Sequence, residues 1–373
     1  NTNAIALASD GTCTANITNK PNRNLIIGGA MNVAQRGTSS TSSGFQTVDR
    51  FAHYGSGWDE AMTQSQSDVA SGTTPYTLGF KKAFKLQNGN QTSGAGAADQ
   101  LYISHKLEAQ DIATSGWNYT SASSYVTLSF WVKSSVAQNF YCYLKAPDGT
   151  AQLYPFETGS LTANTWTKIT KTIPGNSNIQ IDNDNGPGLE INLFPFLGTN
   201  RTDNNATENA WATFNSAART KDNTSTWYTT NDATLEFTGI QLEVGPQATP
   251  FEHRSFGEEL KLCERYCETI LQGEGDGAYM NNTVAYTTNQ MYTIIRFRTP
   301  KRATNPSLTQ TTGTNYYRLY RDGGSTDANG FTDVSWSNIH ASAIYNSMTC
   351  TAGQAGLLGS SNANALLLFT SEL

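Results

Sequence analysis

The sequence has 373 residues, enough for two or three domains that each bury a core. Charged residues make up only 14% of the chain and the net charge is −6, so no basic stripe is available to neutralise a nucleic-acid backbone. No run of 18 or more apolar residues occurs, which argues against a transmembrane span or other membrane insertion.

The N-terminal part of the chain is expected to be a short connector followed by a series of strands. Residues 1–21 are polar and indicate a connector or the end of a stem. From residue 22 to about residue 250, short apolar or alternating segments are separated by turn residues, a pattern typical of strands. The clearest are 125–132 (YVTLSFWV), 139–145 (NFYCYLK), 166–173 (WTKITKTI), 189–197 (LEINLFPFL) and 234–244 (TLEFTGIQLEV). Their length and spacing predict an antiparallel jelly-roll β-sandwich over 22–254.

One segment has the pattern of a helix. Ser255 and Glu258 fit a capping box, and Leu260, Cys263 and Cys267 recur at helical spacing. The sequence therefore predicts a linking helix over 255–272. Cys263 and Cys267 would then lie one helical turn apart, which we interpret as two reduced core thiols. Residues 273–373, with short strands at 293–297, 316–320 and 366–369, predict a small C-terminal β domain.

The titratable residues do not form a catalytic motif. The four histidines, at positions 53, 105, 253 and 340, are isolated, and the adjacent carboxylates Glu258 and Glu259 fall in the first turn of the predicted helix. We therefore expect no enzymatic activity and no cofactor. Asp182 and Asp184 precede Gly186 in a way that partly matches a Ca²⁺ loop, but the later ligands are missing, so we favour a turn over a metal site.

Several strings resemble a known family. They are 24–37 (NLIIGGAMNVAQRG), 47–50 (TVDR), 128–133 (LSFWVK), 240–254 (IQLEVGPQATPFEHR), 263–266 (CERY), 302–308 (RATNPSL) and 370–373 (TSEL). In these the chain resembles tail-fibre and virion structural proteins of bacteriophages, especially marine and cyanobacterial ones. The resemblance implies a jelly roll similar to carbohydrate-binding modules, a linking helix and a C-terminal tip domain.

The resemblance also implies partners and a location. Such fibres are homotrimers on the virion that attach to host cell-surface polysaccharide, and they contact other virion proteins through their N-terminal end. Two alternatives stay open: a structural head-fibre or decoration protein without host contact, and a fibre-borne polysaccharide depolymerase.

Exposed aromatic side chains are the natural candidates for sugar contacts, because sugar C–H faces stack on flat rings while amides and hydroxyls bond the OH groups. Loops of the predicted sandwich carry Trp58, Trp117, Trp211, Trp227 and Tyr228, for which core packing is at least as good an interpretation. For the receptor surface we select the tip residues Tyr316, Tyr317, Arg321, Asp322 and Trp336.

Overall fold

The computed structural model describes residues 5–7, 13–15, 22–273, 279–334 and 336–373, and its regular structure is nearly all β, as the sequence predicts. The chain divides into two compact units. Unit 1 comprises residues 1–32, 38–46 and 51–254, and unit 2 comprises residues 33–37, 47–50 and 255–373. Most of the expected connector 1–21 lies outside the described residues; within it, β1 (Ile5–Leu7) pairs with β2 (Cys13–Ala15).

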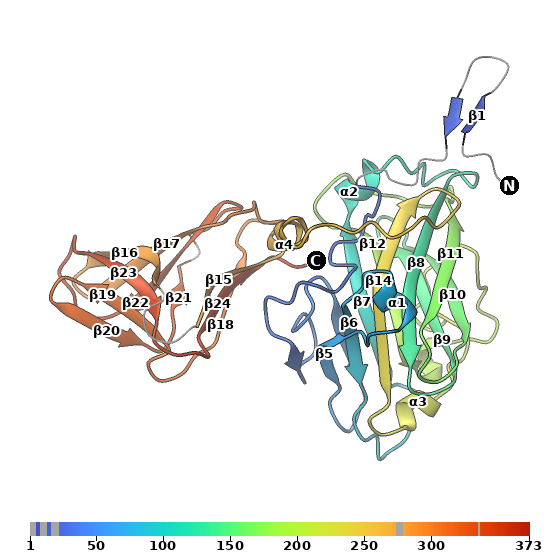
Figure 1. Ribbon diagram of the computed structural model, residues 1–373, viewed down its shortest axis with the longest axis horizontal. Coiled ribbons are helices and arrows are strands. Elements are labelled where there is room, and N and C mark those ends of the chain that lie inside the picture. Colours follow the sequence, from blue (N-terminus) through green and yellow to red (C-terminus); the bar gives the residue numbers. More distant parts are fainter. Residues whose placement is uncertain (1–4, 8–12, 16–21, 274–278, 335) are drawn as a thin grey trace. The chain divides into compact units, whose positions relative to one another are not determined.

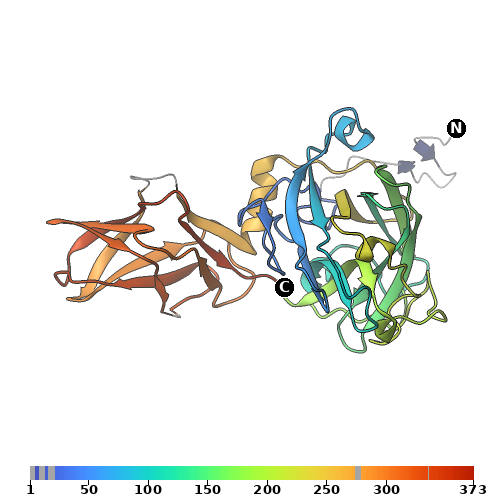
Figure 2. The ribbon, with the colours of Figure 1, turned by 90° about the horizontal axis from the view of Figure 1, so that it is seen from below.

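Unit 1 contains two six-stranded antiparallel sheets, which can be followed in Figures 1 and 2. The first sheet has the order β13 (Ala212–Thr213), β10 (Gln152–Ser160), β9 (Asn139–Ala146), β12 (Pro187–Leu197), β7 (Gln100–Glu108) and β4 (Ala52–Ser56). The second sheet has the order β11 (Thr167–Pro174), β8 (Tyr125–Ser134), β14 (Thr234–Val244), β6 (Lys82–Gln87), β5 (Thr63–Asp68) and β3 (Ser39–Ser40). The strands predicted at 125–132, 139–145, 166–173, 189–197 and 234–244 are therefore confirmed.

The two sheets form a sandwich because each strand turns one row of side chains inward. Ile103 on β7 and Ile191 on β12 lie around the same small internal gap as Leu128 on β8 and Phe237 on β14. All four side chains are buried. Short helices complete the unit: α1 (Thr74–Thr77), α2 (Ala109–Ala113), α3 (Thr226–Thr229) and the 3-10 turn η1 (Thr199–Arg201). No helix among the described residues is long and apolar enough to cross a membrane.

The linking helix is shorter than the sequence predicts. Helix α4 spans Phe256–Glu264 and begins with the predicted capping box of Ser255 and Glu258. Residues Cys267–Gln272 then form strand β15, which pairs with β24 (Leu366–Thr370). The helical period of 255–272 was misleading because Cys267, Thr269 and Leu271 also fit a strand, and pairing with β24 decides between the two. Cys263 and Cys267 are free buried thiols, as expected, but they lie on different elements.

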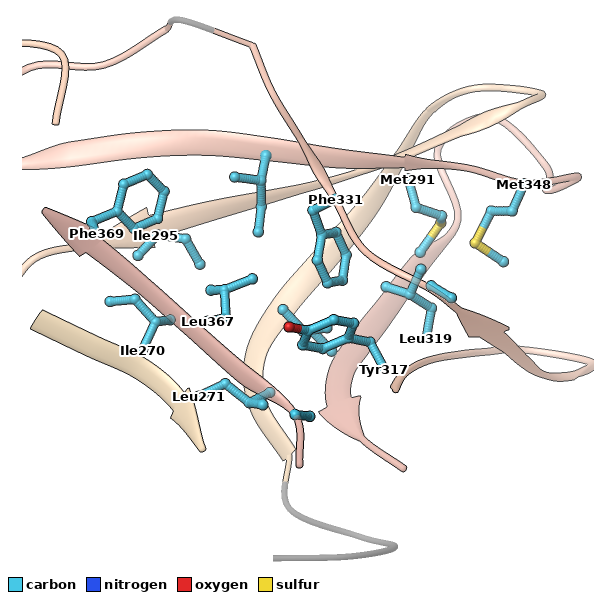
Figure 3. Packing of buried hydrophobic residues seen from close by; sticks show 14 of the residues in the cluster. Ile270, Leu271, Met291, Ile295, Tyr317, Leu319, Phe331, Met348, Leu367 and Phe369 are labelled. Atoms are coloured by element: carbon cyan, nitrogen blue, oxygen red, sulfur yellow. The ribbon is translucent and has the colours of Figure 1, made fainter. Parts of the chain in front are cut away.

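Unit 2 contains a three-stranded and a seven-stranded sheet. The first has the order β15, β24 and β18 (Ser307–Gln310), and the second has the order β20 (Gly324–Ala328), β19 (Tyr317–Arg321), β23 (Ala355–Ser360), β16 (Tyr279–Thr287), β17 (Gln290–Arg296), β22 (Ala341–Ser347) and β21 (Thr332–Asp333). Their core includes Leu271, Ile295, Tyr317, Phe331 and Phe369 (Figure 3).

Two short segments of the predicted sandwich belong to unit 2 instead. The backbone N–H of Thr269 donates to Gln35 Oε1 over 3.0 Å, and the Arg36 guanidinium lies 2.9 Å from Glu372. Arg50 also pairs with Glu372, and its guanidinium carbon lies 3.4 Å from the ring centroid of Tyr266. The expected range 22–254 is therefore corrected by the loss of 33–37 and 47–50 to unit 2. The sequence alone does not indicate that these segments belong to unit 2, because the contacts join residues more than 200 positions apart.

Candidate functional site

The outer face of the first sheet carries aromatic side chains on neighbouring strands. Tyr54 on β4 is paired with Tyr102 on β7, and their ring centroids are 5.7 Å apart. Tyr143 on β9 is paired with Asn192 on β12. Because successive strand residues face opposite sides, the three tyrosines point away from the core that Ile103, Cys142 and Ile191 help to fill. The outer face of the first sheet thus carries aromatic rings as well as polar side chains.

These side chains surround a groove of about 320 Å³, within the usual size range of small-ligand sites. Its lining residues are Tyr54, Tyr102, Ser104, Lys106, Tyr143, Lys145, Glu190, Asn192, Phe214 and Arg219. Beneath them, the ring of buried Phe194 lies 4.9 Å from that of Tyr143 and 6.0 Å from that of Tyr102. The groove therefore has an aromatic base held in place by packing.

Charged side chains lie beside the rings. Lys145 Nζ is 3.2 Å from Glu190 Oε2 and 4.9 Å from the ring centroid of Phe214. On the same ring, the guanidinium carbon of Arg219 lies 5.9 Å from the centroid. Two cations thus lie near the ring of Phe214, an arrangement that the negative face of an aromatic ring favours.

Burial and charge both act on the groove tyrosines. Burial raises the pKa of the Tyr102 phenol, the Arg219 guanidinium opposes that rise, and Glu190 adds to it. The pKa of Tyr143 is also raised, mainly by burial and then by Glu190. Both hydroxyls are therefore neutral at physiological pH and able to donate as well as accept hydrogen bonds.

Asn192 supplies an unusual polar atom. Its side chain is only 2% exposed, and its carboxamide oxygen Oδ1 has no hydrogen-bond partner in the part of the chain that the structure describes. A buried carbonyl without a donor costs about 1–3 kcal/mol. Since Asn192 lines the groove, a ligand that brings a hydroxyl or an N–H into the groove would relieve this cost.

A second, larger cavity in unit 1 of about 490 Å³ is a weaker candidate. It lies on the second sheet, where Trp131, Lys168 and Phe251 contribute to its lining. The imidazole of His253 in this lining is already bonded to the Leu78 carbonyl, with 2.9 Å between Nε2 and the oxygen. Within the described residues, none of its lining side chains has a buried polar atom left without a partner.

The five tip residues selected from sequence do not form one surface. Tyr317 is fully buried in the core of unit 2 (Figure 3), and its hydroxyl lies 2.7 Å from the Leu366 carbonyl oxygen. It cannot meet a ligand, which corrects the selection. Tyr316 packs against the same core, and Arg321 donates to Thr326 Oγ1 over 2.7 Å. Asp322 is exposed in the turn after β19. The error arose because the local sequence does not show that both Tyr316 and Tyr317 pack toward the core of unit 2.

Trp336 is exposed and follows β21, and it packs against a different part of the seven-stranded sheet from Arg321. Its indole is 61% exposed and stacks on Tyr292 of β17, with centroids 5.6 Å apart. Tyr286, also exposed, meets the same indole edge-on. Strands β23 and β16 lie between β17 and β19, which carries Arg321. Trp336 therefore has aromatic neighbours that the sequence analysis did not select.

The aromatic residues selected in the sandwich loops are mostly structural. Trp117, Trp227 and Tyr228 are buried. Trp211 donates from its indole nitrogen to the Pro174 carbonyl oxygen over 2.6 Å. Neither Trp211 nor Trp58 lines the groove.

The carboxylates considered for metal or catalysis are engaged in local structure. Asp184 accepts from the Gly186 N–H, and the Asp182 N–H donates to Asp148, as expected of a turn. Burial, followed by the charges of Asp182 and Asp184, raises the pKa of Asp148. Across residues 5–7, 13–15, 22–273, 279–334 and 336–373, no three His, Cys, Asp or Glu side chains are grouped as metal ligands would be. Glu258 caps α4.

Sequence reasoning missed the groove residues although a signal was present. In the predicted strand 139–145, Tyr141, Tyr143 and Lys145 alternate with Phe140, Cys142 and Leu144. A strand with aromatic residues on both faces indicates that its outer face also has something to contact. Phe214 and Arg219 had no such signal, because both lie outside the longer strands.

The chain has low similarity to known proteins. No family model matches the chain, and no curated protein matches it in sequence. The solved structures to which it is similar include a phage tailspike and bacterial carbohydrate-binding modules.

The tailspike is the enzymatically active domain of tailspike protein 4 from bacteriophage CBA120, at 10% identity and a TM-score of 0.33; the match covers 61% of this chain but 22% of that chain. The N-terminal cellulose-binding domain of Cellulomonas fimi β-1,4-glucanase C matches at 10% identity and a TM-score of 0.27, over 58% of this chain and 99% of that one. The family 11 carbohydrate-binding module of Clostridium thermocellum Lic26A-Cel5E matches at 12% identity and a TM-score of 0.26, over 58% of this chain and 98% of that one.

Proposed function

We propose that unit 1 binds a polysaccharide along the groove on its first sheet. The observation that carries the proposal is the combination of Tyr54, Tyr102 and Tyr143 with the unpartnered carboxamide oxygen of Asn192. Sugar rings present apolar C–H faces to aromatic side chains and hydroxyls to buried acceptors, so one sugar can satisfy both. The groove lies on sheet strands, which fix the spacing of these contacts better than loops would.

We propose further that the chain binds without cutting. Glycoside hydrolysis ordinarily requires two carboxyl groups about 5–9.5 Å apart across the scissile bond. Glu190 is the one carboxylate among the groove-lining residues, and it is paired with Lys145. A single neutralised carboxylate supports recognition better than acid–base chemistry.

The biological role we propose is attachment of a phage to its host through this binding. Its support is the sequence resemblance to phage tail fibres, including the strings at 240–254 and 302–308. On a virion-borne homotrimer, three weak sites would act together, and avidity can exceed the affinity of one site by about 10²–10⁴. In unit 2, exposed Trp336 with Tyr286 and Tyr292 is our candidate for a second, weaker glycan contact.

The test is binding of the labelled full chain to a panel of bacterial strains and their purified surface polysaccharides, with released sugar assayed in the same tubes. Saturable binding without sugar release supports the proposal, and it should weaken in Tyr102→Ala, which removes a partly exposed groove ring. Release of oligosaccharide would mean a depolymerase instead. Absence of binding to every strain and polysaccharide would leave the alternative of a structural virion protein.

A further inference from the structure

The groove has a different charge from the chain as a whole. Its lining includes three cationic side chains, Lys106, Lys145 and Arg219, against the single carboxylate of Glu190. The complete chain carries a net charge of −6. Since charged residues are scarce in this sequence, a local excess of positive charge on a ligand-sized groove calls for an explanation beyond solubility.

One of these cations is already neutralised. Lys145 Nζ lies 3.2 Å from Glu190 Oε2, and both side chains are largely buried. Two further cationic side chains, Lys106 and Arg219, line the groove beside that pair. The field of Arg219 reaches the groove hydroxyls, because it opposes the rise in the pKa of both Tyr102 and Tyr143.

Arg219 is held in position by its neighbours, and one of its N–H groups has no acceptor among the described residues. Its Nη1 donates to Gln100 Oε1 over 3.3 Å, and its guanidinium lies over the ring of Phe214. Its backbone N–H donates to the Arg201 carbonyl over 2.9 Å, which fixes the loop that carries it. The Nε–H is buried without an acceptor among the described residues. A guanidinium with an unused N–H suits an oxyanion, which can accept two parallel hydrogen bonds.

We infer that the groove binds an anionic glycan, and that Arg219 receives the carboxylate or sulfate group of an acidic sugar while the tyrosines contact its ring and those of its neighbours. This inference rests on the function proposed above and adds the ligand class. Lys106 strengthens the attraction as a second cation, and the unpartnered oxygen of Asn192 accepts a sugar hydroxyl. A neutral glycan offers the Arg219 Nε–H only an uncharged hydroxyl or ether oxygen, which is a weaker acceptor than an oxyanion.

The test compares matched polymers by isothermal titration with the full chain: alginate against carboxyl-reduced alginate, and a sulfated galactan against its desulfated form. We expect at least one acidic polymer to bind about tenfold or more tightly than its neutral counterpart at low salt, with the difference shrinking as salt is added. The alginate polymers test for recognition of a carboxylate, and the galactan polymers test for recognition of a sulfate. Equal affinity for acidic and neutral forms in both pairs would overturn the inference but leave carbohydrate binding intact.

Substitutions test which side chain causes the preference for an acidic polymer. Arg219→Gln should abolish the preference for the acidic polymer and retain the weaker binding to the neutral one. Lys82→Gln is the matched control, because it removes one positive charge at an exposed position on β6 in the second sheet. If Arg219→Gln fails to fold, Lys106→Gln serves in its place with a smaller expected loss. An unchanged preference in the folded variants would overturn the inference. Failure of every polymer to bind the wild-type chain would overturn the proposed function itself.

Discussion

Lys145 and Glu190 form an ion pair across β9 and β12, with 3.2 Å between the ammonium nitrogen and the carboxylate oxygen. The two residues are directly paired in the sheet register. Opposite charges in such a position stabilise the sheet. The pair therefore contributes structure to the groove, whereas Tyr54 and Tyr102, whose side chains are partly exposed, remain available for a ligand.

Removing one groove ring should weaken glycan binding. We expect Tyr102→Ala to lower the affinity for a bound polysaccharide by about 1 kcal/mol, roughly fivefold, because one stacking face is lost. Titration of the variant against the wild-type chain measures the loss. Tyr76→Ala, on α1 and outside the groove, is the control and should bind normally. Equal losses in both variants would argue against a specific role for Tyr102.

The bulge in β14 should not tolerate a side chain at Gly239. This glycine has a φ of +64°, and an added Cβ would lie 2.6 Å from the ring of Phe80. The register of β14 and β8 shifts at this position. Gly239→Ala should lower the free energy of unfolding of unit 1 by about 2–3 kcal/mol.

Thermal denaturation tests this, with Gly72→Ala as the comparison. Gly72 also has a positive φ, of +83°, but an added Cβ would have nothing within 4 Å. The smaller loss expected for Gly72→Ala measures the backbone cost alone. Similar losses in the two variants would show that the contact with Phe80 is unimportant.

His53 should make unit 1 sensitive to mild acid. Its side chain is fully buried, neither ring nitrogen has a hydrogen-bond partner in the described part of the chain, and burial lowers its pKa from 6.5 to about 4. Between these values the unfolded chain binds more protons than the folded one, so the free energy of unfolding falls as the pH falls from about 6.5 to 4. The whole shift corresponds to about 3 kcal/mol.

Denaturant titrations at several pH values measure this dependence. His53→Leu should flatten it, whatever the effect of the substitution on absolute stability. A variant whose unfolding free energy still falls with the wild-type slope would assign the acid sensitivity to other groups.

Tyr317 should matter for the stability of unit 2 and not for binding. Its hydroxyl lies 2.8 Å from the Thr311 carbonyl oxygen and 2.7 Å from that of Leu366, so its single proton serves one of them at a time. Tyr317→Phe should cost about 1 kcal/mol in unfolding free energy. Tyr286→Phe, at a position 64% exposed, should leave the melting temperature unchanged. A loss of glycan binding in stably folded Tyr317→Phe would contradict this assignment.

Removal of divalent ions should leave the protein unchanged. Asp182 and Asp184 lie in a turn whose carboxylate contacts are to backbone N–H groups, and both residues are largely accessible to water. We therefore expect the same melting temperature with and without EDTA. A decrease that Ca²⁺ restores would establish a structural metal at this turn.

Much of the architecture followed from local patterns in the sequence. Alternation in 166–173 and the apolar runs at 125–132 and 234–244 predicted strands, because the side-chain period of two is imposed by the backbone itself. The capping box at Ser255 likewise predicted where α4 begins, since both hydrogen bonds are made within four residues. The end of α4 was not predictable in this way, because the partner of β15 lies about 100 residues further along.

The sequence by itself determined the strand-rich class, the start of the helix and the low-charge surface, all of which depend on neighbouring residues or on composition. Only the tertiary structure decided that Tyr317 is buried, that segments 33–37 and 47–50 join unit 2, and that Tyr54, Tyr143 and Arg219 meet at one groove. These outcomes depend on strand order and register, which bring together residues far apart in the chain. A glycan site built across several strands is therefore visible only once the sheet has formed.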